Sequence, residues 1–179
     1  RRTLGASPTR LLELAAFYKA KYDKVSAWYG GPHDIVLSAS FLLLHGPLLG
    51  RPAVACLQPY VEGEKRDVIA DLGGGVARLL EDDRALTEQF CFFVRRTLEI
   101  RSREDACVDL LGPGNLVVVR EGGFLALKLI DYGILDLHTL EDESPANFTR
   151  LAEALRRLES LAALPQRLTK RSPQGNGSR

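Results

Sequence analysis

Two short segments of the sequence carry oxygen-bearing side chains that could hold a divalent metal ion. The first is Asp109-Leu110-Leu111-Gly112-Pro113-Gly114-Asn115, and the apolar run Leu116–Val119 follows it. The second is Leu129-Ile130-Asp131-Tyr132-Gly133. Magnesium prefers oxygen ligands, and in phosphoryl transfer it is held by one or two side chains together with nucleotide phosphates. The pattern therefore predicts phosphoryl-transfer chemistry, with Asn115 and Asp131 as the metal ligands.

These two segments lie at the open end of a predicted β-hairpin. The runs 108–119 and 124–130 are rich in apolar and β-branched residues, and Glu121-Gly122-Gly123 supplies turn chemistry between them. Such a hairpin presents the Asn115 amide at the mouth of one strand and the Asp131 carboxylate at the mouth of the other. We expect both groups to reach one cation, and Gly133 to let the chain turn sharply away from it.

The same segments resemble motifs of the protein-kinase and aminoglycoside-phosphotransferase superfamily. Asp131-Tyr132-Gly133 is similar to the Asp-Phe-Gly magnesium motif, and Gly112-Pro113-Gly114-Asn115 is similar to the end of the catalytic loop. The resemblance implies ATP and Mg²⁺ as cofactors, Asn115 and Asp131 as metal ligands, and Asp131 with Asp109 as catalytic residues. It also implies an α+β, kinase-like fold: a partial small lobe joined through a hinge to a shortened helical large lobe with a catalytic-loop β-hairpin.

Other parts of the chain follow the order of elements in that family. A predicted helix over 9–29 would take the place of the regulatory helix of the small lobe. Predicted strands at 34–44 and 53–60 would be the last two strands of that lobe's sheet. A predicted helix over 83–101 would be the central helix of the large lobe. Gln58-Pro59-Tyr60-Val61-Glu62-Gly63 resembles the hinge, which implies that the backbone of Gln58, Tyr60 and Val61 holds the adenine. A final amphipathic helix is expected over 144–164. The implied division is 1–62 for the partial small lobe and hinge, 63–164 for the large lobe, and 165–179 for a disordered tail.

Two features depart from the family pattern. The catalytic Asp normally stands five positions before the Asn, where this chain has Leu110, and Asp109 lies one residue earlier. If the loop has one inserted residue relative to the family, Asp109 would be the catalytic base or would orient the acceptor hydroxyl of a protein or a small molecule. Without such an insertion, Asp109 is a local loop residue. No Gly-rich phosphate loop or strand lysine precedes the first helix. We expect either a kinase-like domain that is incomplete at its N-terminus, or an inactive pseudokinase-like scaffold.

A second interpretation begins from Val68-Ile69-Ala70-Asp71-Leu72-Gly73-Gly74-Gly75. This run is similar to the first motif of SAM-dependent methyltransferases and to a phosphate loop of actin-like ATPases, in which glycines admit a nucleoside close to a strand end. Both families need a strand before the loop Asp71–Gly75, and residues 64–67 leave little room for one. The sequence instead predicts a short helix over 67–72 that the three glycines break.

Composition bears on the remaining functional classes, which are nucleic-acid binding, cysteine-based metal or disulfide sites, and membrane association. A formal net charge of +1 provides no field that would recruit nucleic acid. The three cysteines show no metal or disulfide-framework spacing, which is typical of reduced, buried thiols in a cytoplasmic protein. No apolar run approaches the ~20 residues of a membrane span, so no membrane partner is expected. The excess of 18 arginines over 6 lysines is typical of a GC-rich bacterial genome.

Overall fold

A computed structural model describes residues 8–44, 53–61 and 64–163. These residues form an α+β protein, as the sequence predicts. Its elements are α1 (Pro8–Trp28), β1 (Ser40–Leu44), β2 (Ala53–Leu57), β3 (Lys65–Asp67), α2 (Gly75–Asp82), α3 (Arg84–Glu104), β4 (Ala106–Val108), β5 (Leu116–Glu121), β6 (Phe124–Leu129), β7 (Ile134–Asp136), α4 (Leu137–Glu143) and α5 (Pro145–Ala162). None of the helices in this part of the chain is long and apolar enough to cross a membrane.

The strands of the described residues pair into three small antiparallel sheets, β1–β2, β3–β5–β6 and β4–β7. The predicted hairpin is confirmed as β5–β6, with Leu116 opposite Leu129 and Glu121 opposite Phe124. Its first strand is shorter than the predicted run 108–119, because Val108 ends the separate strand β4 and β5 begins only at Leu116. Its two turn residues, Gly122 and Gly123, have φ of 55° and 92°. Only glycine adopts two consecutive positive φ values at little cost, so this pair fixes the register of the hairpin.

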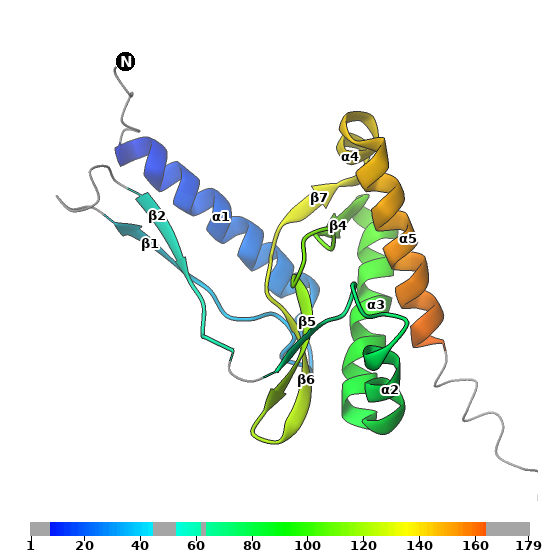
Figure 1. The fold of residues 1–179 in the computed structure, drawn as a ribbon. Helices are drawn as coiled ribbons and strands as arrows, with labels where there is room; N and C mark the ends of the chain where they lie inside the picture. The colour runs from blue at the N-terminus through cyan, green and yellow to red at the C-terminus, as the bar shows by residue number, and fades with distance from the viewer. Residues whose placement is uncertain (1–7, 45–52, 62–63, 164–179) are drawn as a thin grey trace, which may run out of the picture.

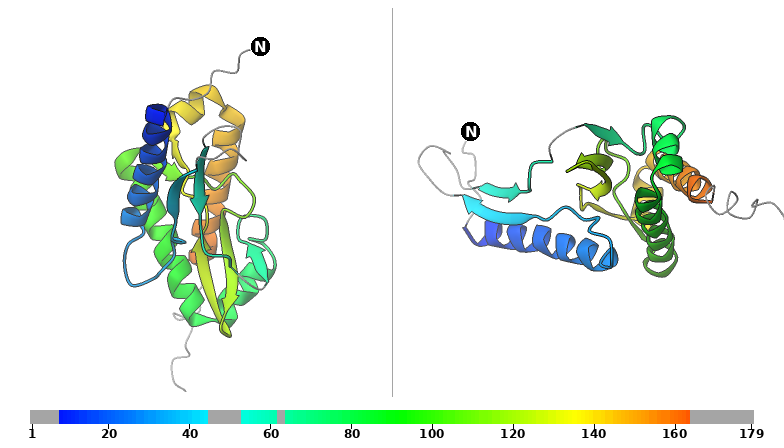
Figure 2. Two further views of the ribbon diagram at one scale, coloured as in Figure 1. Left: turned by 90° about the vertical axis from the view of Figure 1, so that its left-hand side faces the viewer. Right: turned by 90° about the horizontal axis from the view of Figure 1, so that it is seen from below.

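The central β3–β5–β6 sheet lies between two groups of elements (Figure 1). On one side, α2, α3 and α5 pack together, and α3 turns its buried face, which includes Phe90 and Phe93, toward the core. On the other side, α1 and the β1–β2 hairpin extend away from the helices, as the view from below shows (Figure 2). One main hydrophobic cluster joins the C-terminal end of α1 to α3, α5 and the hairpin, since Val25, Trp28 and Tyr29 belong to it.

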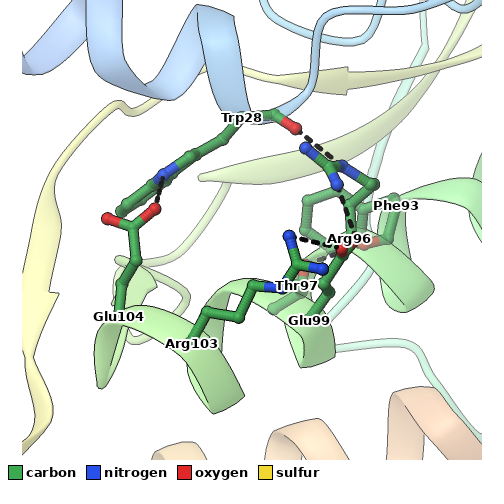
Figure 3. Close-up of polar contacts among 7 residues, drawn as sticks. All are labelled: Trp28, Phe93, Arg96, Thr97, Glu99, Arg103 and Glu104. Atoms are coloured by element: carbon green, nitrogen blue, oxygen red, sulfur yellow. Dashed lines mark hydrogen bonds and ion pairs between the residues drawn. The ribbon is translucent and has the colours of Figure 1, made fainter.

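Polar contacts fix the end of α1 against α3 (Figure 3). The carbonyl oxygen of Trp28, at the last turn of α1, accepts a hydrogen bond from Arg96 Nε at 2.9 Å. This bond satisfies a carbonyl that has no partner within the helix. The indole Nε1 of Trp28 donates to Glu104 Oε1 at 2.7 Å. Glu104 also forms an ion pair of 2.8 Å with Lys24. The position of α1 is therefore set at its C-terminal end.

Several predicted elements need correction. The predicted helix over 67–72 is wrong: β3 ends at Asp67, turns follow, and the helix α2 starts only at Gly75. The physical reason is that the Asp67 carboxylate accepts the N–H groups of Ile69 and Ala70, at 2.9 and 3.0 Å, which closes a turn. The predicted strands at 34–44 and 53–60 are shorter, as β1 and β2. The sequence did not indicate β3, α2, β7 or α4.

The predicted boundary at 62/63 and the predicted tail 165–179 lie outside the described residues. Within them, the first part of the chain does not have a core of its own. Val25 and Trp28 of α1, and Tyr29 directly after it, share one hydrophobic cluster with residues of α3, β5 and α5. The C-terminal end of α1 is thus packed into the same body as the predicted large lobe.

Candidate functional site

Two antiparallel strand pairs bring the predicted metal-binding segments to one place. Asp109 follows β4 and Gly133 precedes β7; their backbones are joined by a bond from the Asp109 N–H to the Gly133 carbonyl, at 2.8 Å. Asn115 precedes β5 and Ile130 follows β6; the Ile130 N–H donates to the Asn115 carbonyl, also at 2.8 Å. Since Asp131 lies between Ile130 and Gly133, the three polar residues meet where the β4–β7 and β5–β6 pairs end.

The two carboxylates flank Gly133. A Cβ atom on this glycine would lie 3.5 Å from Asp131 Oδ1, 3.6 Å from Asp109 Oδ2 and 3.0 Å from Asp109 Cβ. The last of these distances is tighter than ordinary side-chain packing allows. A side chain at position 133 would therefore force Asp109 to shift, because the backbone passes between these two acidic side chains.

The side chain of Asn115 is held by the loop that precedes it. Its Nδ2 donates to the carbonyl oxygen of Asp109 at 2.9 Å, which assigns Oδ1 as the atom available to a cation. Gly112 packs directly on this amide: a Cβ there would lie 2.8 Å from Asn115 Nδ2 and 3.0 Å from Oδ1. The Gly-Pro-Gly loop therefore folds closely around the amide and couples its orientation to Asp109.

Each carboxylate has one oxygen oriented by the backbone. Asp109 Oδ1 accepts the N–H of Leu111, and Asp131 Oδ1 accepts the N–H of Gly133, both at 2.8 Å. Among the described residues, no hydrogen bond or ion pair reaches Oδ2 of Asp109 or of Asp131. Leu110, which stands five positions before Asn115, is buried in the core at 1% exposure. Asp109, not Leu110, is the residue that faces Asp131.

This donor set suits a magnesium ion better than a metal that needs an all-protein cage. Within residues 8–44, 53–61 and 64–163, no group of three or more His, Cys, Asp or Glu side chains is arranged to hold a metal. The site instead offers two carboxylates and one amide oxygen. Magnesium keeps several waters and takes the rest of its octahedral shell from substrate phosphates, so one or two carboxylates are sufficient. Asp131 and Asn115 would hold such an ion, and Asp109 would lie beside it.

The three residues of the predicted hinge differ in their relation to this site. Gln58 Nε2 donates to the carbonyl oxygen of Ile130 at 2.8 Å, so Gln58 contacts the residue directly before Asp131. Val61 is buried in a small apolar cluster of the described residues whose other buried members are Leu37, Val117 and Val119. The side chain of Tyr60 is 81% exposed, and Lys65 Nζ lies 4.7 Å from its ring centroid. Gln58 and Val61 are thus brought toward the site, and the Tyr60 side chain is not.

Sequence reasoning missed the environment of Tyr132. Its ring packs edge-on against Tyr22 of α1 and Phe41 of β1, with centroid distances of 5.5 and 5.7 Å. Its hydroxyl lies 2.5 Å from Cys56 Sγ on β2. Burial and this contact with Cys56 together raise the pKa of the Tyr132 hydroxyl, so the side chain is neutral at physiological pH. No local sequence signal could have shown these contacts, because the Cys56–Tyr132 pair is 76 residues apart.

Asp67 is a further residue that the sequence did not single out. Its Oδ2 accepts the N–H of Gly114, the residue before Asn115, at 2.6 Å. The separation of 47 residues again lies beyond any local pattern. β3, which ends at Asp67, therefore contacts the loop that carries the candidate metal ligand.

The loop Asp71–Gly75 does not have the surroundings that the methyltransferase or actin-like interpretation needs. The strand before it, β3, is at the edge of its sheet and runs antiparallel to β5, not in the centre of a parallel sheet. The Asp71 carboxylate is already engaged: it accepts the Gly75 N–H at 3.0 Å and pairs with Arg66 at 3.1 Å. The Gly75 N–H and the Arg66 guanidinium lower the pKa of Asp71, so it is a charged residue that stabilises its own loop.

Comparisons with known proteins found no match: no family model, no curated protein and no solved structure is similar to this chain.

Proposed function

We propose that this chain contains the metal-binding half of a kinase-like phosphotransferase site, which binds ATP through Mg²⁺ held by Asp131 and Asn115. The observation that carries the proposal is the arrangement around Gly133. Asp109, Asn115 and Asp131 come from segments up to 22 positions apart in the sequence, yet the two carboxylates flank one glycine and the amide is bonded to the backbone of Asp109. A structural turn alone does not need this combination of acceptors.

The apolar cluster around Val61 supports a nucleotide beside the metal. Val61, Val117 and the partly buried Ile130 belong to this cluster, and in the chain Ile130 directly precedes Asp131 while Val117 lies two residues after Asn115. Nucleotide bases bind on apolar surfaces that have a few polar groups at their edge. In this proposal the base lies on the cluster, the backbone at Gln58–Val61 holds its polar edge, and the phosphates point toward the two carboxylates.

Bound magnesium would neutralise charge on the phosphates and on the transition state. The residues of the chain supply position. The Asp109 Oδ1–Leu111 bond and the Asp131 Oδ1–Gly133 bond hold each carboxylate in one orientation, so that Oδ2 of Asp109 can accept the proton of an acceptor hydroxyl. The Asn115 amide is oriented by Asp109, so these groups act as one preorganised unit.

One observation favours a catalytically inactive, scaffold-type function as the second candidate. None of the ion pairs among the described residues brings a lysine or arginine to Asp109 or Asp131. Phosphotransferases of the kinase type use such a cation on the phosphates. We therefore expect these 179 residues to bind nucleotide and to turn it over poorly by themselves.

Calorimetric titration with ATP, with and without Mg²⁺, tests the proposal. We expect binding that depends on Mg²⁺ and that Asp131→Ala abolishes, because a principal metal ligand is lost. Asp136→Ala is the matched control: Asp136 lies nearby in the sequence, but its carboxylate caps α4 by accepting the Thr139 N–H at 2.8 Å. This control should lose some helix stability and keep ATP binding.

Three outcomes would contradict different parts of the proposal. ATP binding that is absent, or equal with and without Mg²⁺, would exclude the metal site. Intact Mg²⁺-dependent binding without phosphate transfer in the full-length protein would favour the scaffold function over the enzyme. Robust phosphate transfer by the 179 residues alone would show that the site has its phosphate-binding cation after all.

A further inference from the structure

The Asp67 carboxylate accepts three backbone N–H groups, two near in sequence and one remote. Oδ1 takes the N–H groups of Ile69 and Ala70, at 2.9 and 3.0 Å. These two bonds fix the carboxylate relative to β3. Oδ2 takes the N–H of Gly114 at 2.6 Å, across a separation of 47 residues. A carboxylate bound in this way is a rigid anchor, since bonds to an ionised acceptor are stronger than bonds between neutral groups.

The anchored residue, Gly114, decides how Asn115 is presented. Its φ of 74° is a left-handed conformation that glycine adopts easily, and the loop reverses there before β5 begins. The side-chain Nδ2 of Asn115 donates to the backbone carbonyl of Asp109. The backbone carbonyl of Asn115 accepts the N–H of Ile130. Both of those partners belong to the two motif segments themselves. The bond from Asp67 to Gly114 is the additional restraint, and it comes from a separate strand.

The position of β3 itself does not depend on the Asp67 carboxylate. β3 pairs with β5 through Lys65 opposite Val119 and Arg66 opposite Val118. The Val68 N–H also donates to the Leu116 carbonyl at 2.9 Å, and Val68 is fully buried. Removal of the carboxylate therefore leaves strand β3 in place and releases only the turn at Ile69–Ala70 and the Gly114 N–H.

We propose that Asp67 is a positioning residue that acts through Gly114 to hold the Asn115 amide in the orientation for metal binding. This inference rests on the proposed function of Asn115 as a magnesium ligand. Groups that orient a metal ligand commonly change metal affinity by 10- to 100-fold when they are removed. Asp67 does not contact the reacting groups, so its effect should appear in the magnesium dependence and not in the affinity for metal-free nucleotide.

The test compares Asp67→Ala with Asp71→Ala, a control in the same loop whose carboxylate binds Gly75 and Arg66. The probe is Mg²⁺ titrated into the protein with a non-hydrolysable ATP analogue. We expect Asp67→Ala to raise the Mg²⁺ concentration at half-saturation about tenfold. Asp71→Ala should leave it unchanged, and neither variant should change the affinity for the analogue without metal.

A second measurement, on the ligand-free protein, separates this inference from the proposed function. The NMR resonances of the Asn115 side-chain NH₂ group should shift or broaden in Asp67→Ala and stay at the wild-type positions in Asp71→Ala. If wild-type protein shows no Mg²⁺-dependent binding, the proposed function fails, and these resonances still decide the role of Asp67.

Unchanged Asn115 resonances in a folded Asp67→Ala variant, or an equal magnesium effect in Asp71→Ala, would overturn the inference. If Asp67→Ala does not fold, Asp67→Asn takes its place. This variant keeps one acceptor oxygen and should give a smaller shift in the same direction, whereas wild-type behaviour in both measurements would count against Asp67.

Discussion

The hydroxyl group of Tyr29, the residue directly after α1, donates a hydrogen bond to Thr97 Oγ1 on α3, and the two oxygens are 2.8 Å apart. Thr97 Oγ1 donates its own hydrogen to the Phe93 carbonyl at 2.8 Å, so Tyr29 must be the donor. Both side chains are 1% exposed. Burial raises the pKa of the Tyr29 hydroxyl, which keeps it protonated and able to donate. This buried bond joins the end of α1 to the main helix of the body.

The Tyr29–Thr97 pair gives the first prediction. Thr97→Val keeps the shape of the side chain but leaves the Tyr29 hydroxyl buried without an acceptor, which should lower the free energy of unfolding by about 1–3 kcal/mol. In the double variant Tyr29→Phe/Thr97→Val no hydroxyl is stranded, so most of that loss should return. Urea denaturation of the four proteins of the cycle measures the effect. Strictly additive losses would show that the two groups are not coupled.

A second prediction concerns Gly112. In Gly112→Ala the new methyl group would meet the Asn115 amide at 2.8–3.1 Å, and the amide must move because it is the contacted group. We expect the Mg²⁺-dependent affinity for nucleotide to fall at least tenfold, comparable with other displaced ligands. Gly73→Ala is the control, since a Cβ there has no atom within 4 Å. Equal titration curves for Gly112→Ala and wild type would remove Asn115 from the site.

The third prediction is a loss of stability at alkaline pH that depends on Cys107. Burial raises the pKa of this fully buried thiol from 9.0 to about 12. Above pH 9 the unfolded chain releases this proton while the folded protein keeps it. The stabilisation is therefore complete below pH 9 and is lost as the pH rises toward 12, by up to about 1.4 kcal/mol per pH unit. Tyrosines add to the loss only above about pH 10.

Chemical denaturation between pH 7 and 10 checks this behaviour. The slope of stability against pH above pH 9 should be reduced in Cys107→Ala and retained in Cys56→Ala, which removes an exposed thiol. A slope that persists in Cys107→Ala would assign the alkaline loss to another group.

The sequence predicted the elements that have a clear local period. The hairpin β5–β6 followed from its apolar strands and its Gly122-Gly123 turn, and the nearness of Asn115 to Asp131 followed from the hairpin. The long helices α3 and α5 were also predicted within a few residues of their ends. In these cases one local pattern and the tertiary packing favour the same conformation.

The rest depended on contacts that no local window contains. Val68, Ile69 and Leu72 have spacing that suits a helix, but the Asp67 carboxylate competes for the same N–H groups and closes a turn. Apolar spacing also does not decide burial along α1, since Leu12 is 57% and Phe17 53% exposed. The N-terminal half of α1 extends past the body, on the side where the β1–β2 hairpin lies, and β1 and β2 both contact α1 (Figure 2).

The packing of Tyr132 has a mechanical consequence. Its ring rests on Tyr22 of α1, and α1 is anchored farther along at Trp28, where Arg96 and Glu104 hold it. Because α1 is held at Trp28 and contacts Tyr132 through Tyr22, a rotation of α1 about Trp28 would change the Tyr22–Tyr132 contact. A tilt of the N-terminal part of α1 about Trp28 would move Tyr22 against the Tyr132 ring and would shift the neighbouring residue, Asp131.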